Sequence, residues 1–211
     1  MKNLWNKFVA WLILSIGKVE WKAKDTLSQD EQAKIREMLI NDYYIILTRR
    51  NNHLSTFFTS LANFVLTGKW GYWSHALMNM EDEVKDNKDF RLIEAVGKGV
   101  VYTPFDHVFD VHGTCILKPK YMSTDNWTLV LDKAKLQLGK PYDTLFDIRN
   151  DNNLSCVELC RAALMGEPNY ASNFANFEAL ISKRHDNLSP DMFYGLDDFE
   201  VVYEVRRPLK K

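Results

Sequence analysis

The pattern of apolar and polar positions divides the first 49 residues into an apolar run, a predicted helix and a predicted strand. Residues 8–16 form an almost uninterrupted apolar run. Ser28 fits a helix N-cap, because Glu31 stands three residues later in the capping-box position and apolar residues follow at helical spacing. Residues 42–49 are rich in β-branched and aromatic side chains, which predicts a buried strand.

The middle of the chain predicts a sheet. Residues 72–81 and 90–96 are strand-like runs separated by a polar, charged stretch, so we expect them to pair as a hairpin. Further strands are predicted at residues 100–103, 112–118 and 199–205.

Helical spacing interrupts these strands. The predicted helices cover residues 51–67, residues 124–138 with Thr124 as the cap, a segment beginning at Cys156, and residues 174–181. Helices followed by a mostly antiparallel sheet with inserted helices predict an α+β fold, with the sheet packed against helices and an extra helical segment at the N-terminus.

Composition is that of a folded domain. The chain has 211 residues, 46% of them hydrophobic, which suffices for one full core. The formal net charge is −1, so no global charge favours binding to nucleic acid. Three cysteines do not make the disulfide framework of a small secreted protein, and without clustered histidines they predict no metal and no cofactor. We therefore favour a cytoplasmic location, with membrane-associated or exported locations as alternatives.

The apolar N-terminus has three interpretations. It is too short to cross a bilayer, and no small-x-small cleavage site follows it. It could be an interfacial or core-packed helix, an uncleaved or atypical signal, or a helix that binds a partner. The first interpretation includes peripheral contact with a membrane.

Cys156 is the strongest candidate for a reactive residue. Ser155 fits an N-cap and Glu158 the capping-box position, which places Cys156 at the first helical residue. The positive end of a helix dipole favours a thiolate, the nucleophilic form of cysteine. The alternative is a small buried side chain with a packing role.

A thiolate nucleophile needs a base, and His75 is the best candidate. It lies in the strand of residues 72–81, while Glu94 takes an apolar position on the next strand. A buried carboxylate and a buried imidazole on adjacent strands would satisfy each other, which makes Glu94 the residue that orients His75. A simple hairpin salt bridge is the alternative for Glu94, and His112 is the substitute for His75.

The remaining histidines and cysteines are weaker candidates for catalytic residues. His53, His107 and His185 occupy positions that predict solvated side chains. Cys115 is predicted to be a core residue. Cys160 is predicted to pack one turn along from Cys156, with a redox pair as the lesser alternative.

Five motifs in order resemble a known family. They are Tyr44-Ile-Ile-Leu-Thr-Arg49, Trp73-Ser-His-Ala76, Leu92-Ile-Glu-Ala95 with Gly99-Val100, Gly139-Lys-Pro-Tyr-Asp143, and Ser155-Cys-Val-Glu-Leu159. Together they resemble the circularly permuted NlpC-like cysteine hydrolases, the YiiX-like branch of the papain-like superfamily, which is related to the lecithin:retinol acyltransferase group. The resemblance covers roughly residues 42–204. We expect residues 42–211 to form one permuted domain and residues 1–41 to form an N-terminal helical extension.

The resemblance implies a reaction and its residues. Cys156 would be the nucleophile, His75 the base and Glu94 the third member of the triad, with histidine before cysteine as the permutation requires. Tyr142 matches a tyrosine that lines the site, and Trp73 is a second candidate for substrate binding. Many relatives have Cys-Ser-Glu where this chain has Cys156-Val-Glu158, and Tyr43 replaces a common glycine.

The expected function is therefore a cysteine peptidase or amidase. A peptide or cell-wall amide bond would be cleaved through an acyl-enzyme. The alternatives are a lipid acyltransferase or phospholipase of the same superfamily, and a catalytically silent module that binds a membrane or a partner.

Overall fold

A computed structural model describes most of the chain. The described residues are 26–50, 56, 59–60, 63–64, 69–80, 91–144, 152–165 and 189–207. The apolar run of residues 8–16, the hairpin connection, the predicted helix of residues 174–181 and most of the predicted helix of residues 51–67 lie outside these ranges.

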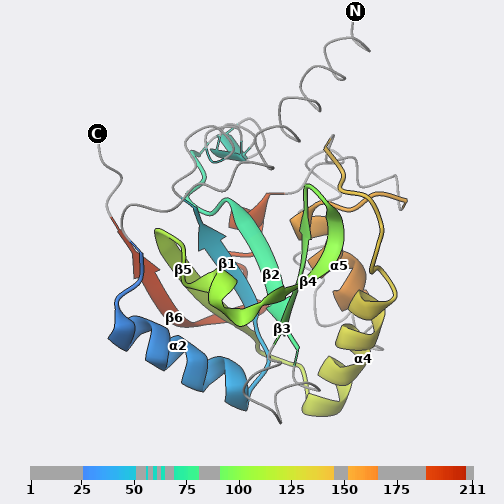
Figure 1. Ribbon diagram of the computed structural model, residues 1–211. Helices are drawn as coiled ribbons and strands as arrows, with labels where there is room; N and C mark the ends of the chain where they lie inside the picture. The colour runs from blue at the N-terminus through green and yellow to red at the C-terminus, as the bar shows by residue number, and fades with distance from the viewer. Residues whose placement is uncertain are drawn as a thin grey trace, which may run out of the picture.

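A six-stranded antiparallel sheet forms the centre of the molecule (Figure 1). Its strand order is β4-β3-β2-β1-β5-β6. The strands are β1 (Ile45–Arg49), β2 (His75–Asn79), β3 (Arg91–Val96), β4 (Gly99–Pro104), β5 (Gly113–Pro119) and β6 (Phe199–Arg206). The predicted α+β class and the antiparallel pairing are confirmed.

Apolar side chains are buried on both faces of the sheet. On one face the core includes residues of α4 (Thr124–Lys135) and α5 (Cys156–Leu164), which lie side by side in Figure 1. On the other face, residues of α2 (Gln29–Asn41) and of the 3-10 helix η1 (Phe105–Val108) pack against the sheet. A second 3-10 helix, η2 (Pro190–Met192), precedes β6. Because both faces of the sheet are covered, side chains on both sides of the central strands are buried, and their sequences are nearly continuous apolar runs.

The helix starts follow the capping chemistry of the sequence, with one correction. Ser28 caps α2 and Ser155 caps α5, each with its predicted glutamate in a closed capping box. Thr124 was the wrong cap for α4, because the extended backbone at Ser123 lets its hydroxyl accept a hydrogen bond from the Asn126 N–H. None of the helices in the described ranges is long and apolar enough to cross a membrane.

The segment of residues 139–142 ties α5 to the edge of the sheet. The Val100 N–H donates to the Lys140 carbonyl, and the Gly139 N–H donates to the Val100 carbonyl, both at 2.9 Å. The Leu154 N–H then donates to the Pro141 carbonyl at 3.0 Å, directly before α5. The position of Cys156 therefore depends on the start of β4.

Gly99 allows this close approach. Its φ is +103°, and a Cβ there would lie 2.4 Å from the Lys140 carbonyl oxygen. We expect Gly99→Ala to lower the free energy of unfolding by about 3 kcal/mol, since a left-handed backbone is strained even before the clash is added. Urea denaturation followed by tryptophan fluorescence measures the loss.

Gly195→Ala is the matched control. Gly195 has a φ of +80° but open space around the added Cβ, so this variant carries the backbone strain alone. We expect it to lose about 1 kcal/mol. Equal losses in the two variants would show that contact with residue 140 contributes nothing.

Candidate active site

Cys156 lies at the first helical position of α5. The Ser155 N–H donates to Glu158 Oε2 at 2.6 Å, and the Glu158 N–H donates to Ser155 Oγ at 3.4 Å. These bonds fix the first turn of the helix. Cys156 is buried in the core there, with an exposed fraction of 3%. No described residue accepts a hydrogen bond from the Cys156 N–H, so this donor remains available at the positive end of the helix.

His75 and Glu94 are brought together as the hairpin pattern predicts. His75 Nε2 lies 2.5 Å from Glu94 Oε2, and the glutamate side chain is 1% exposed. The β2–β3 ladder pairs Met78 with Ile93 and Asn79 with Leu92, so Glu94 follows directly after the paired stretch on β3, while His75 stands at the start of β2 before it. On the other side of β2, His75 pairs with Thr48 at the end of β1.

The Cys156 sulfur completes the cluster. Burial disfavours the charged form of His75, but the charge and hydrogen bond of Cys156, and then the hydrogen bond and charge of Glu94, raise its pKa to about 9. Because His75 Nε2 faces Glu94, Nδ1 is the nitrogen left for Cys156. At neutral pH this geometry therefore places a protonated His75 beside the Cys156 sulfur.

Glu94 remains a carboxylate despite its burial. Burial alone would raise its pKa, but hydrogen bonds from His107 and His75, together with the charge of the His75 ring, hold the pKa well below its usual range. A fully ionised Glu94 can orient the imidazole of His75 and stabilise its positive charge.

His107 is a member of the cluster that the sequence prediction missed. It was predicted to be solvated in a turn; it lies in η1, its side chain is 34% exposed, and its Nδ1 lies 2.6 Å from Glu94 Oε1. Phe105 and Val108 are buried on either side of it in η1, and this anchors the ring over the sheet. One argument from the sequence could have indicated a second partner: a buried carboxylate has two oxygens that each need a hydrogen bond, and His75 satisfies only one of them.

His112, the predicted substitute base, takes no part in the cluster. Its side chain is buried, and neither ring nitrogen has a hydrogen-bond partner. Within the described residues, no contact joins it to Cys156 or Glu94.

Tyr142 lies beside the thiol. It forms an isolated parallel bridge with Leu154 and packs against the core. Burial, and the charges of Cys156, Glu158 and Asp143, raise the pKa of its phenol well above the usual value. The hydroxyl therefore stays protonated next to Cys156.

Trp73 does not line the site. Its exposed fraction is 0%, and its ring packs edge-on against Tyr72 at 4.8 Å between centroids. The prediction that it binds substrate is corrected to a core role. Its backbone does support the site, since Asp191 accepts hydrogen bonds from the Tyr72 and Trp73 N–H groups at 2.8 and 3.0 Å, just before His75.

The other two cysteines differ chemically from Cys156. Burial raises the pKa of the Cys115 thiol to about 12 and that of Cys160 well above its usual value. Both are fully buried, and all three cysteines are free thiols.

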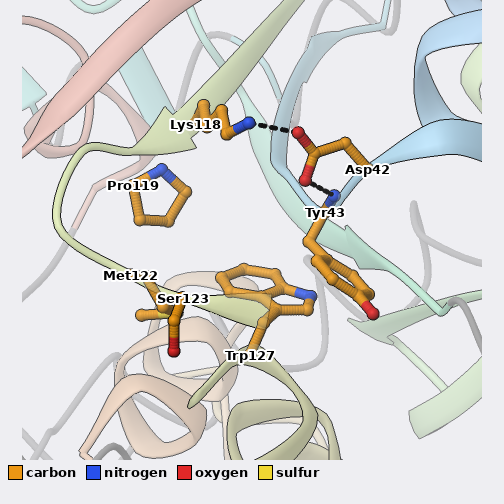
Figure 2. A pocket seen from close by; sticks show the side chains of 7 residues that line it. All are labelled: Asp42, Tyr43, Lys118, Pro119, Met122, Ser123 and Trp127. Carbon is orange, nitrogen blue, oxygen red and sulfur yellow. Dashed lines mark hydrogen bonds and ion pairs between the residues drawn. The ribbon is translucent and has the colours of Figure 1, made fainter. Parts of the chain in front are cut away.

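A cavity of 360 Å³ lies at the other end of the sheet (Figure 2). Its walls include Tyr43, Trp127 and an ion pair between Lys118 and Asp42. Asp42 precedes β1 and Lys118 lies near the end of β5, whereas His75 pairs with Thr48 near the end of β1. This cavity is therefore separate from the thiol cluster.

Comparison with known proteins identifies the fold. No protein-family profile matches the chain, and no curated protein matches it. Among solved structures, the crystal structure of metalloprotein yiiX from Escherichia coli O157:H7, DUF1105, is similar to it with a TM-score of 0.55 and 20% identity. The match covers 78% of this chain and 97% of that chain. The fold is thus YiiX-like.

The contact between Cys156 and His75 predicts an order of pKa changes. Cys156→Ala should lower the pKa of His75 from about 9 more than Glu94→Gln does, because Cys156 supplies the larger of the two favourable interactions. Titration of the His75 Cε1–H signal by NMR measures both values. An unchanged pKa in Cys156→Ala would contradict the contact.

The same shift has a consequence for stability. The pKa of His75 lies above its ordinary value of 6.5, so its charged form contributes stability below about pH 6.5 that is lost as the pH rises through about 9. The difference in unfolding free energy between wild type and Cys156→Ala should therefore be larger at pH 6 than at pH 10.

Proposed function

We propose that this protein is a cysteine hydrolase that cleaves an amide bond through an acyl-enzyme on Cys156. The observation that carries the proposal is the juxtaposition of three groups. The Cys156 thiol stands at a helix N-terminus against the imidazole of His75, whose other nitrogen is 2.5 Å from the buried Glu94. A nucleophile, its base and an orienting carboxylate are the parts that thiol acyl transfer requires.

The proposed reaction proceeds in two stages. The Cys156 thiolate attacks the substrate carbonyl carbon, and the negative oxygen that forms accepts a hydrogen bond from the Cys156 N–H. The His75 imidazolium gives its Nδ1 proton to the leaving nitrogen, the C–N bond breaks, and an amine and a thioester result. Water then attacks the thioester, His75 takes its proton, and the acid is released as the C–S bond breaks.

The fold supports a permuted papain-like arrangement. The similarity to yiiX covers nearly all of that chain. Here the strand that carries His75 precedes the helix that carries Cys156, which is the order the permutation requires. Tyr142, with its protonated hydroxyl beside Cys156, is the residue we expect to line the substrate site.

The similar structure, yiiX, is described as a metalloprotein. Both Glu94 oxygens are engaged by imidazole nitrogens. Across the described ranges, no group of three or more His, Cys, Asp or Glu side chains is arranged to hold a metal ion. The residues that the structure describes therefore do not fit a metal, and the proposed mechanism takes no step through one.

Selective alkylation tests the nucleophile. At neutral pH iodoacetamide should modify Cys156 and leave Cys115 and Cys160 unmodified until the protein is unfolded, because burial keeps those two thiols protonated. Peptide mapping by mass spectrometry identifies the modified residue. Modification of all three cysteines only after unfolding would favour an inert binding module.

Substitution tests the reaction itself. Against a panel of peptide amides and lipid esters, Cys156→Ala and His75→Ala should each lower hydrolysis at least about 100-fold. Cys115→Ala removes a thiol elsewhere in the core and should retain the activity. Full activity in either site variant would overturn the proposal, and turnover of esters alone would redirect it to lipid substrates.

Metal removal provides an independent check. Dialysis against EDTA should change neither the rate of Cys156 alkylation nor the hydrolysis of the substrate found in that panel, because the reacting groups all belong to the chain. Loss of both on chelation, with recovery on adding a divalent metal, would contradict the metal-free mechanism.

A further inference from the structure

Glu94 is shared between two histidines. One carboxylate oxygen faces His75 Nε2 at 2.5 Å, and the other faces His107 Nδ1 at 2.6 Å. The two rings come from different elements, β2 and η1, and Glu94 lies between them on β3. A carboxylate held at both oxygens cannot rotate without losing one hydrogen bond, so contact with His107 limits the direction in which Glu94 meets His75.

Arg50 determines which nitrogen of His107 carries the proton. Its guanidinium Nη2 contacts His107 Nε2, and a guanidinium can only donate. His107 Nε2 must therefore accept this hydrogen bond, which leaves the proton on Nδ1, where it is donated to Glu94. In this arrangement His107 is a neutral donor, and Glu94 keeps its full negative charge for His75.

Arg50 is itself tied to the strand end that carries the base. Its backbone N–H donates to Ser74 Oγ at 3.3 Å, and the Ser74 N–H donates to the Thr48 carbonyl at 3.0 Å. Ser74 is the residue before His75. Arg50, the residue after β1, therefore contacts both His107 and the residue that precedes His75 on β2.

We propose that His107 and Arg50 are positioning residues of the thiol site. Arg50 holds His107 in the Nδ1–H tautomer, and His107 holds Glu94 as an oriented carboxylate that keeps His75 charged beside Cys156. This inference rests on the proposed function, because it assigns to both residues an effect on the reactivity of Cys156.

Another ion pair lies on η1 next to this cluster. From α2, Arg36 reaches η1, where it pairs with Asp106 at 3.1 Å. The Asp106 side chain is 81% exposed, and it is not among the groups that shift the pKa of the buried Glu94. Glu94 and Arg50 face His107, and His75 stands between Glu94 and Cys156.

The rate of Cys156 alkylation by iodoacetamide, measured from pH 5 to pH 10, tests His107. His107→Leu should be about tenfold slower than wild type at pH 6, the effect of one pKa unit on the thiolate population. At pH 10, where the thiol ionises without help, the two rates should converge. His107→Asn places an amide N–H near the position of Nδ1 and should restore most of the rate at pH 6.

Asp106→Asn is the matched control. It lies next to His107 in η1 and removes the ion pair with Arg36, yet it makes no contact with Glu94, so its profile should equal that of wild type. A His107→Leu rate that is reduced equally at pH 6 and pH 10 indicates a general structural defect and overturns the proposal. So does a His107→Leu profile identical to that of wild type.

The tautomer is read by ¹⁵N NMR of the imidazole nitrogens at pH 7. Wild type should show His107 protonated at Nδ1, and Arg50→Met should allow a proton on Nε2. A proton on Nε2 in wild type would overturn the role of Arg50. If wild-type Cys156 reacts only above about pH 8.5, the ordinary thiol pKa, the proposed function fails first, and this outcome is distinct from a failure confined to the His107 variants.

Discussion

The site depends on one buried negative charge. Glu94 lies inside the sheet with 1% of its side chain exposed, where an unpaired carboxylate would be very costly. Two imidazoles offset that cost, one on each oxygen, and the resulting low pKa keeps the group ionised. His75 in turn holds its proton to about pH 9 because it lies between Glu94 and Cys156.

This arrangement explains why separate parts of the fold meet where they do. β2 and β3 supply His75 and Glu94, η1 places His107 over Glu94, and α5 directs its N-terminus at His75. The connection through Gly99 and residues 139–142 fixes the start of α5 relative to β4. Each group is held by backbone on a rigid element, as a preorganised site requires.

Local chemistry made much of this predictable. The Ser155 capping box marked the start of α5 and the position of Cys156 without reference to any other part of the chain. The hairpin pattern placed His75 and Glu94 on neighbouring strands, because a carboxylate at an apolar strand position needs a partner. The wrong cap for α4 was a one-residue error of the kind that helix ends commonly produce, since Ser123 and Thr124 are both acceptable caps.

The sequence by itself determined the described strands, the starts of α2 and α5, the antiparallel α+β class, the nucleophile candidate and its hairpin partners, because each of these follows from short-range periodicity or from one strand pair. Only the tertiary structure decided that Trp73 is core, that His107 contacts Glu94, and that Arg50 contacts His107. These contacts join residues 13 to 57 positions apart, and they arise from how η1 and the end of β1 pack over the sheet. Packing of that kind leaves no periodic signal along the chain.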